Sequence, residues 1–161
     1  MKSIMYHYVR DYNSEYPSFI HLSKDKFINQ IKNFQNNGII ENENEIFNFN
    51  KKYILTFDDG FKDHLYVAEE LKKRNYIGIF FIPTLPYKNK TILDVHKAHL
   101  ITGKMGGTKS LNMLFKYLKD TKEDKFLNTI EKEKFKSAYK NQNDEEDKKE
   151  FKRIINYYGD V

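Results

Sequence analysis

Cysteine and tryptophan are both absent from this chain of 161 residues, and proline occurs only three times. The lack of cysteine excludes disulfides, zinc–thiolate centres and cysteine nucleophiles, so any bound metal ion must be held by His, Asp or Glu side chains. Long apolar runs are also missing. No segment approaches the roughly 20 apolar residues of a membrane helix, and residues 1–10 are too polar for a secretory signal. We expect a cytoplasmic protein with no membrane span.

Charge of one sign does not gather in any part of the sequence. The chain has 28 Lys and Arg against 23 Asp and Glu, but the two signs alternate, as in residues 122–140. A nucleic-acid-binding surface needs clustered basic residues with aromatic ones between them. We therefore predict no nucleic-acid partner. A basic, helical interaction protein remains an alternative that rests only on the net charge of +5 and the helix-rich second half.

The first half of the chain alternates between strand and helix patterns. Residues 3–9, 53–57 and 77–82 are short apolar runs rich in β-branched and aromatic side chains. Between these runs, a segment that starts after Ser23 and ends near Gly38, and residues 62–75, have apolar side chains at helical spacing. This order predicts parallel strands joined by helices, with ligands at the carboxyl edge of the sheet.

The second half contains helix patterns only. They cover residues 94–102, 110–119, 122–136 and 144–158, with breaks at Gly103 and at Gly106-Gly107. Residues 103–110 contain glycine, lysine and serine but not in the order of a phosphate-binding loop, so we interpret them as a helix break. The sequence thus predicts an α/β part followed by a helical part.

The sharpest motif is Thr56-Phe57-Asp58-Asp59-Gly60, at the end of the second predicted strand. Two adjacent carboxylates at a strand end must diverge, so one can bind a metal ion while the other accepts a proton. The glycine lets the backbone turn away without crowding the site. A solvated surface turn is the alternative for so short a motif.

This pentapeptide is identical to the first motif of the polysaccharide deacetylases, the NodB-like carbohydrate esterases, which the chain resembles over residues 1–100. Residues 5–9 resemble the opening strand of that family, and residues 78–82 resemble its Phe-Phe strand. The resemblance implies an α/β fold, a partial deformed (β/α) barrel, with residues 1–102 as its N-terminal part. Residues 103–161 would then be a helical insertion or an incomplete C-terminal part.

The resemblance also implies a metal-dependent hydrolase that removes N-acetyl groups from a glycan or glycan precursor. Asp59 would be a ligand of one divalent ion, zinc or alternatively cobalt or nickel. Asp58 would be the general base that deprotonates a metal-bound water. A carbohydrate would be the partner molecule.

Histidines complete the metal site of the family at a spacing of four residues, whereas His96 and His99 are three apart. Both of them, or His99 alone, would be ligands, and the alternative is that they are ordinary structural histidines. Asp94 is expected to cap their helix. His7 is expected either to contact substrate at the same sheet edge or to lie in the core, and His64 to be structural or exposed.

The later motifs of the family, including the histidine that acts as general acid, have no counterpart after His99. Two alternatives therefore remain: an active deacetylase, or a truncated, catalytically inactive homologue that only binds glycan or a partner chain. An incomplete barrel would also leave sheet edges exposed, through which chains can associate.

Overall fold

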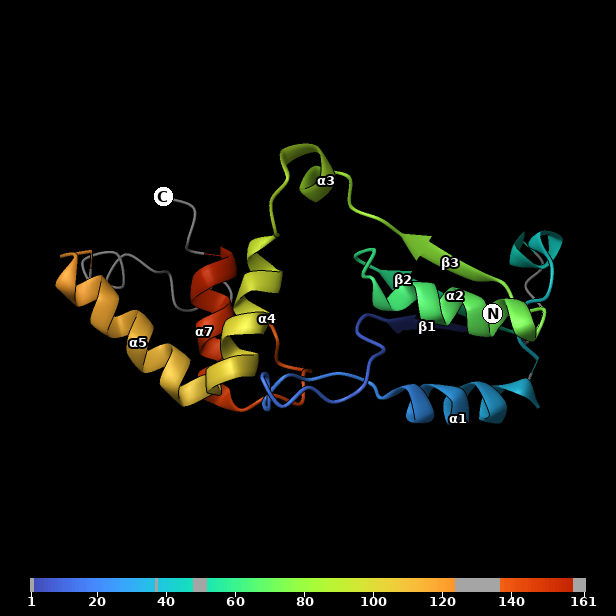
Figure 1. The fold of residues 1–161 in the computed structure, drawn as a ribbon, viewed down its shortest axis with the longest axis horizontal. Helices are drawn as coiled ribbons and strands as arrows, with labels where there is room; N and C mark the ends of the chain where they lie inside the picture. The colour runs from blue at the N-terminus through green and yellow to red at the C-terminus, as the bar shows by residue number, and fades with distance from the viewer. Residues whose placement is uncertain (1, 37, 48–51, 124–136, 158–161) are drawn as a thin grey trace. The chain divides into compact units, whose positions relative to one another are not determined.

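The computed structural model describes residues 2–36, 38–47, 52–123 and 137–157 of the chain, which divides into two compact units. Unit 1 consists of Met1–Tyr12 and Ile20–Lys90, and unit 2 of Asn13–Phe19 and Thr91–Val161. Figure 1 shows that the strands belong to the first unit and that the later helices form the second. The boundary that the family resemblance implies after residue 102 stays a prediction.

Unit 1 contains a parallel sheet of three strands in the order β1-β2-β3. The strands are β1 (Lys2–Tyr6), β2 (Tyr53–Asp58) and β3 (Gly78–Phe81). Helix α1 (Lys24–Gln35) follows β1, and helix α2 (Asp63–Lys73) joins β2 to β3 (Figure 1). The predicted parallel arrangement is confirmed. Because β2 is central, its carboxyl end lies between those of its two neighbours.

Helix α1 begins and ends where its sequence signals predict. The Ser23 side chain accepts a hydrogen bond from the main-chain nitrogen of Lys26 at 3.3 Å, which satisfies one of the free N–H groups of the first turn. Phe27 and Ile31 are fully buried on one face. Gly38 adopts a left-handed conformation with φ +76°, and a short 3-10 helix, η1 (Glu43–Phe47), follows.

The core of unit 1 is built around Phe57, the strand residue that precedes the paired aspartates. Its fully buried ring stacks on Tyr6 at 5.3 Å and on Phe80 at 4.8 Å, the residues opposite it on β1 and β3. Each such pair adds about 0.5–1.5 kcal/mol beyond the burial of its area. A Cβ atom at Gly78 would come within 2.6 Å of Leu71 Cδ1, so β3 can approach α2 only because this residue is glycine. This packing fixes the end of β2.

Unit 2 contains the helices α4 (Asp94–Met105), α5 (Gly107–Asp120) and α7 (Glu146–Tyr157). Its buried apolar core consists of Ala98, Leu111, Phe151 and Ile154. The predicted break at Gly106 is confirmed, and this residue has φ +79°. The break predicted at Gly103 is wrong, since α4 continues through that residue, where a Cβ would come within 2.6 Å of the Phe19 ring. The helix predicted over residues 122–136 lies almost entirely outside the described residues.

The α/β class is confirmed, whereas the partial barrel is not shown and one short helix was not predicted. Among the described residues the sheet stays open, with β1 and β3 each paired on one side, so the structure does not show a barrel. Barrel closure needs further strands, and the described segments after β3 are helices and loops. A short helix, α3 (Leu85–Asn89), was not predicted, although proline is favoured in a first helical turn, where Pro86 lies. None of the described helices is long and apolar enough to cross a membrane.

Candidate functional site

The paired aspartates lie at the carboxyl end of the central strand, as the motif predicts. Asp58 is the last residue of β2, and Asp59 begins the turn with φ +77°, followed by Gly60 with φ +60°. A left-handed conformation is uncommon for a residue with a side chain, although aspartate tolerates it better than most. Two consecutive residues of this kind turn the chain sharply away from the sheet. Such strain is found preferentially at functional sites.

His7 lies beside Asp59 at the same edge of the sheet. Its Nε2 atom is 3.8 Å from Asp59 Oδ2, and the two side chains are 40% and 27% exposed. His7 follows the end of β1, which pairs with β2, and this brings the two residues together across 52 positions of sequence. Of the two alternatives for His7, the structure supports a position at the sheet edge over one in the core.

His64 holds the backbone of His7 in place. It lies in the first turn of α2, is buried, and donates from Nε2 to the carbonyl oxygen of His7 at 2.8 Å. Its ring also packs edge-on against Phe57 at 5.7 Å. Of the two alternatives predicted for His64, structural or exposed, the structure supports the structural one, and the residue links α2 to the candidate site.

A second polar pair borders this edge. The Nε atom of Arg10 donates to Asp63 Oδ2 at 2.6 Å, and its guanidinium lies 4.8 Å from the centre of the Tyr8 ring. Burial, and then the negative charge of Asp59, raise the pKa of Tyr8, so its phenol stays protonated at neutral pH. Sequence reasoning missed this group, because residues 53 positions apart share no periodicity that would reveal their contact.

His96 and His99 lie on α4 and belong to unit 2, whereas Asp58, Asp59 and His7 belong to unit 1. Asp94 is not the N-cap that was expected. Leu93 holds that position, and Asp94 is the first helical residue, accepting from Lys97 Nζ at 2.8 Å. The two histidines are close enough to interact electrostatically.

The surroundings of His99 are positively charged. Burial, the charge of Lys152 and then that of His96 lower the pKa of His99 from 6.5 to about 4, and Lys148 acts in the same direction. The imidazole is therefore neutral at pH 7, the form that binds metals. However, the same lysine charges that oppose a proton on this ring also oppose a divalent cation.

These lysines form a buried ionic cluster with Asp144. The Asp144 carboxylate lies 2.5 Å from Lys152 Nζ and 3.5 Å from Lys148 Nζ, and the three side chains are 2%, 5% and 9% exposed respectively. Lys148 also donates to the carbonyl oxygen of Ser18 at 3.0 Å. Burial opposes ionisation of Asp144, but the hydrogen bond and charge of Lys152 outweigh it and lower the pKa of the carboxyl.

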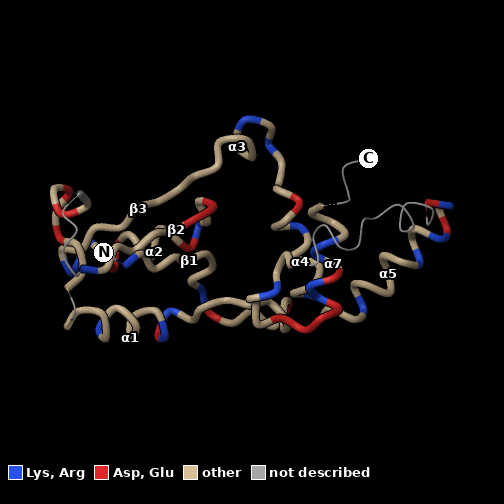
Figure 2. The backbone as a smooth tube through the Cα atoms, turned by 180° about the vertical axis from the view of Figure 1, so that it is seen from behind, with Lys and Arg blue, Asp and Glu red and all other residues tan. Residues whose placement is uncertain are grey.

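The remaining charges of the described chain are mixed in sign. Figure 2 shows Lys and Arg positions interleaved with Asp and Glu along the described trace, as the sequence predicts.

The described residues contain no group of three or more His, Asp or Glu side chains positioned to hold a metal ion. His7 and Asp59 are thus a pair of potential ligands without a third in the described part of unit 1.

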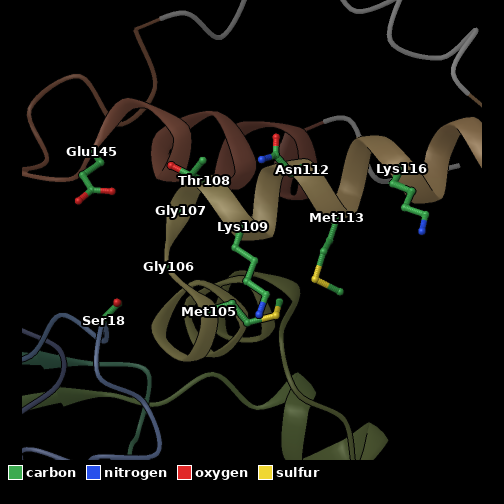
Figure 3. A pocket seen from close by; sticks show the side chains of 10 residues that line it. All are labelled: Ser18, Met105, Gly106, Gly107, Thr108, Lys109, Asn112, Met113, Lys116 and Glu145. Atoms are coloured by element: carbon green, nitrogen blue, oxygen red, sulfur yellow. The ribbon is translucent and has the colours of Figure 1, made fainter.

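Each unit also has a cavity. In unit 1 a cavity of about 440 Å³ lies beside Gly60. It is lined mainly by apolar side chains of α2, of β3 and of the segment that follows β3. In unit 2 a cavity of about 600 Å³ surrounds the junction of α4 and α5. Figure 3 shows Lys109 and Met113 extending from α5 on the side of Met105. The cavity in unit 1 is the one that touches the aspartate turn.

The chain is therefore a mixed α/β protein, with a small parallel sheet, six described α-helices and two adjacent carboxylates at the carboxyl edge of the sheet. No protein-family model matches it, and no curated protein matches it. Among solved structures, the chain is similar to the crystal structure of a Bacillus anthracis protein that is provisionally assigned as a polysaccharide deacetylase. The identity is 23% and the TM-score 0.44, over 60% of this chain and 34% of that one. The match thus spans about a third of that protein.

Proposed function

We propose that this chain carries the catalytic edge of a carbohydrate deacetylase, a hydrolase that removes N-acetyl groups from a glycan with one divalent metal ion. The observation that supports this most is the position of Asp58 and Asp59. They occupy the carboxyl end of the central strand, in a strained turn, with His7 beside Asp59. Ligands of open parallel sheets bind at this edge. The motif itself is that of the polysaccharide deacetylases.

The residues of unit 1 fit part of a metal site. Bonds from zinc to imidazole nitrogen and carboxylate oxygen are about 2.0–2.2 Å. The 3.8 Å between His7 Nε2 and Asp59 Oδ2 is therefore short enough for one ion to contact both. We infer that Asp59 and His7 hold the ion. The family resemblance predicted His96 and His99 as ligands, but the lysine charges near His99 weigh against that ring, so the proposal places His7 beside Asp59 instead.

In this proposal each carboxylate has its own task. A divalent ion in this position would polarise the acetyl carbonyl and make a bound water more acidic. Asp58 would accept the proton of the attacking water and return a proton to the leaving amine nitrogen, and Asp59 would be the carboxylate that holds the ion. His64 would keep His7 oriented through its bond to the His7 carbonyl oxygen. Tyr8, a protonated phenol near Asp59, adds a hydrogen-bond donor to the same edge.

A catalytically inactive, glycan-binding homologue is the second candidate. The observation in its favour is that the described residues offer two ligands at this edge and no third. An ion held by two side chains binds weakly. Such a protein would keep the sheet edge and the adjoining cavity, and with them the ability to bind sugar without releasing acetate.

Metal binding and acetate release separate the two candidates. Zinc affinity should be measured by calorimetry for the wild type, Asp59→Asn and, as a matched control, Asp63→Asn, whose carboxylate pairs with Arg10. Asparagine is chosen because it tolerates the left-handed conformation of Asp59. Loss of a direct ligand should lower affinity by more than the roughly 10–100-fold that loss of an outer-shell partner causes. The control should bind like the wild type.

The histidine variants then identify the remaining ligand. We expect His7→Ala to weaken zinc binding and His99→Ala to leave it unchanged. Asp58→Asn should keep the metal but lower acetate release from an N-acetylated chitooligosaccharide by about 10²–10⁴-fold. The deacetylase proposal fails if the folded wild type releases no acetate with zinc bound. In that case the inactive homologue is the better interpretation.

A further inference from the structure

We propose that the cavity beside Gly60 is a binding subsite for a sugar ring, with Tyr87 as the aromatic platform on which the ring stacks. The choice of a sugar rests on the proposed function, but the subsite itself does not require catalysis. Nothing in the motif points to Tyr87, which lies on the unpredicted helix α3. The contacts of its side chain assign it this role.

Tyr87 is an exposed ring held in a defined position. Its side chain is 64% exposed, yet its hydroxyl donates to the carbonyl oxygen of Gly60 at 3.1 Å. An exposed tyrosine without such a bond loses rotamer freedom when a ligand binds. A ring that is already fixed loses less, so binding is tighter. The bond also ties the ring to the residue that follows Asp59.

The cavity has the size and composition of a small-molecule site. Its volume of about 440 Å³ lies within the roughly 300–1,000 Å³ of typical ligand pockets. Ile82 and Leu65 are exposed apolar side chains on its wall, and Lys62 supplies an ammonium donor. A pyranose ring has an apolar C–H face and hydroxyl groups around its edge. It therefore matches a wall that combines aromatic rings, aliphatic groups and an ammonium donor.

The cavity also lies where a glycan chain would extend. Gly60 lines it and directly follows the two aspartates, so a sugar placed in the cavity is next to a unit placed at the carboxylates. The glycine is itself required here. A Cβ atom at this position would lie 2.9 Å from Ile82 Cγ2 and 3.3 Å from the Tyr87 hydroxyl, inside the cavity wall.

The test is a titration of the full chain with the β-linked tetramer of N-acetylglucosamine in the absence of metal. Binding is measured by calorimetry and by NMR. Tyr87→Ala should weaken binding by about tenfold or more, the equivalent of roughly 1.4 kcal/mol. Tyr87→Phe keeps the ring but loses the bond to Gly60, so it should bind more weakly than the wild type and more tightly than Tyr87→Ala. The matched control is Tyr117→Ala, which removes a ring that is 62% exposed on α5 and should change nothing.

The outcomes separate the subsite from the catalytic proposal. If the tetramer does not bind, or binds Tyr87→Ala as well as the wild type, the subsite is refuted even where Asp59 binds zinc. If Tyr87→Ala loses the tetramer while the wild type releases no acetate, the subsite stands and the deacetylase proposal falls. A wild-type dimer that Tyr87→Ala dissociates would also refute the subsite, because a second copy would then cover this patch.

Discussion

Replacing Asp144 by asparagine should destabilise unit 2 more than replacing either of its lysine partners. Asp144 is the only acidic member of the cluster with Lys148 and Lys152, and all three side chains are less than a tenth exposed. Asparagine keeps the shape of the side chain but leaves two buried ammonium groups without a counter-charge. Removal of one partner from a buried ion pair costs about 3–5 kcal/mol, and we expect a value in this range.

The lysine variants give the scale for comparison. Lys152→Met removes the 2.5 Å contact but leaves Lys148 and Asp144 as a balanced pair, so we expect a smaller loss of about 1–3 kcal/mol. Lys149→Met is the matched control on the same helix. Its partner Glu146 is 77% exposed, and because water screens such a pair, its loss should destabilise the protein least of the three.

Urea denaturation, monitored by far-UV circular dichroism, measures the free energy of unfolding of each of the three variants. The signal reports on unit 2 because this unit is helical. The expected order of destabilisation is Asp144→Asn, then Lys152→Met, then Lys149→Met. The reasoning is refuted if Lys152→Met is as damaging as Asp144→Asn. It is also refuted if Asp144→Asn falls within about 0.5 kcal/mol of the wild type, the range of ordinary surface substitutions.

Two other predictions concern pH and backbone strain. The pKa of His99 is about 4 in the folded protein against 6.5 in the unfolded chain, so the unfolded chain takes up this proton first as the pH falls. Between pH 6.5 and 4 the free energy of unfolding should therefore decrease, by up to about 3 kcal/mol, and His99→Gln should flatten this dependence in pH-dependent urea titrations. Gly60→Ala should lower thermal stability as measured by the melting temperature. The positive φ of this position is worth about 1–2 kcal/mol, and the new methyl group would also press on Ile82 and Tyr87.

The elements nearest the paired aspartates could be predicted from the sequence because their signals are local. The apolar run of β2, the Ser23 cap of α1 and the left-handed Gly38 each depend on neighbouring residues, and the structure confirms them. Predictions failed where a distant contact decided the outcome. Gly103 did not end α4, because it packs against Phe19 from a segment far earlier in the chain.

The sequence by itself determined that two carboxylates end the central strand, since strand periodicity and a turn glycine are both local features. Only the tertiary structure decided which side chains accompany them. The pairing of β1 with β2 brings His7 to Asp59, and a hydroxyl on α3 reaches Gly60. The tertiary structure also buries Lys148 and Lys152 around Asp144, although charged residues of this kind are usually solvated. These contacts join residues that no sequence period relates, so packing alone selects them.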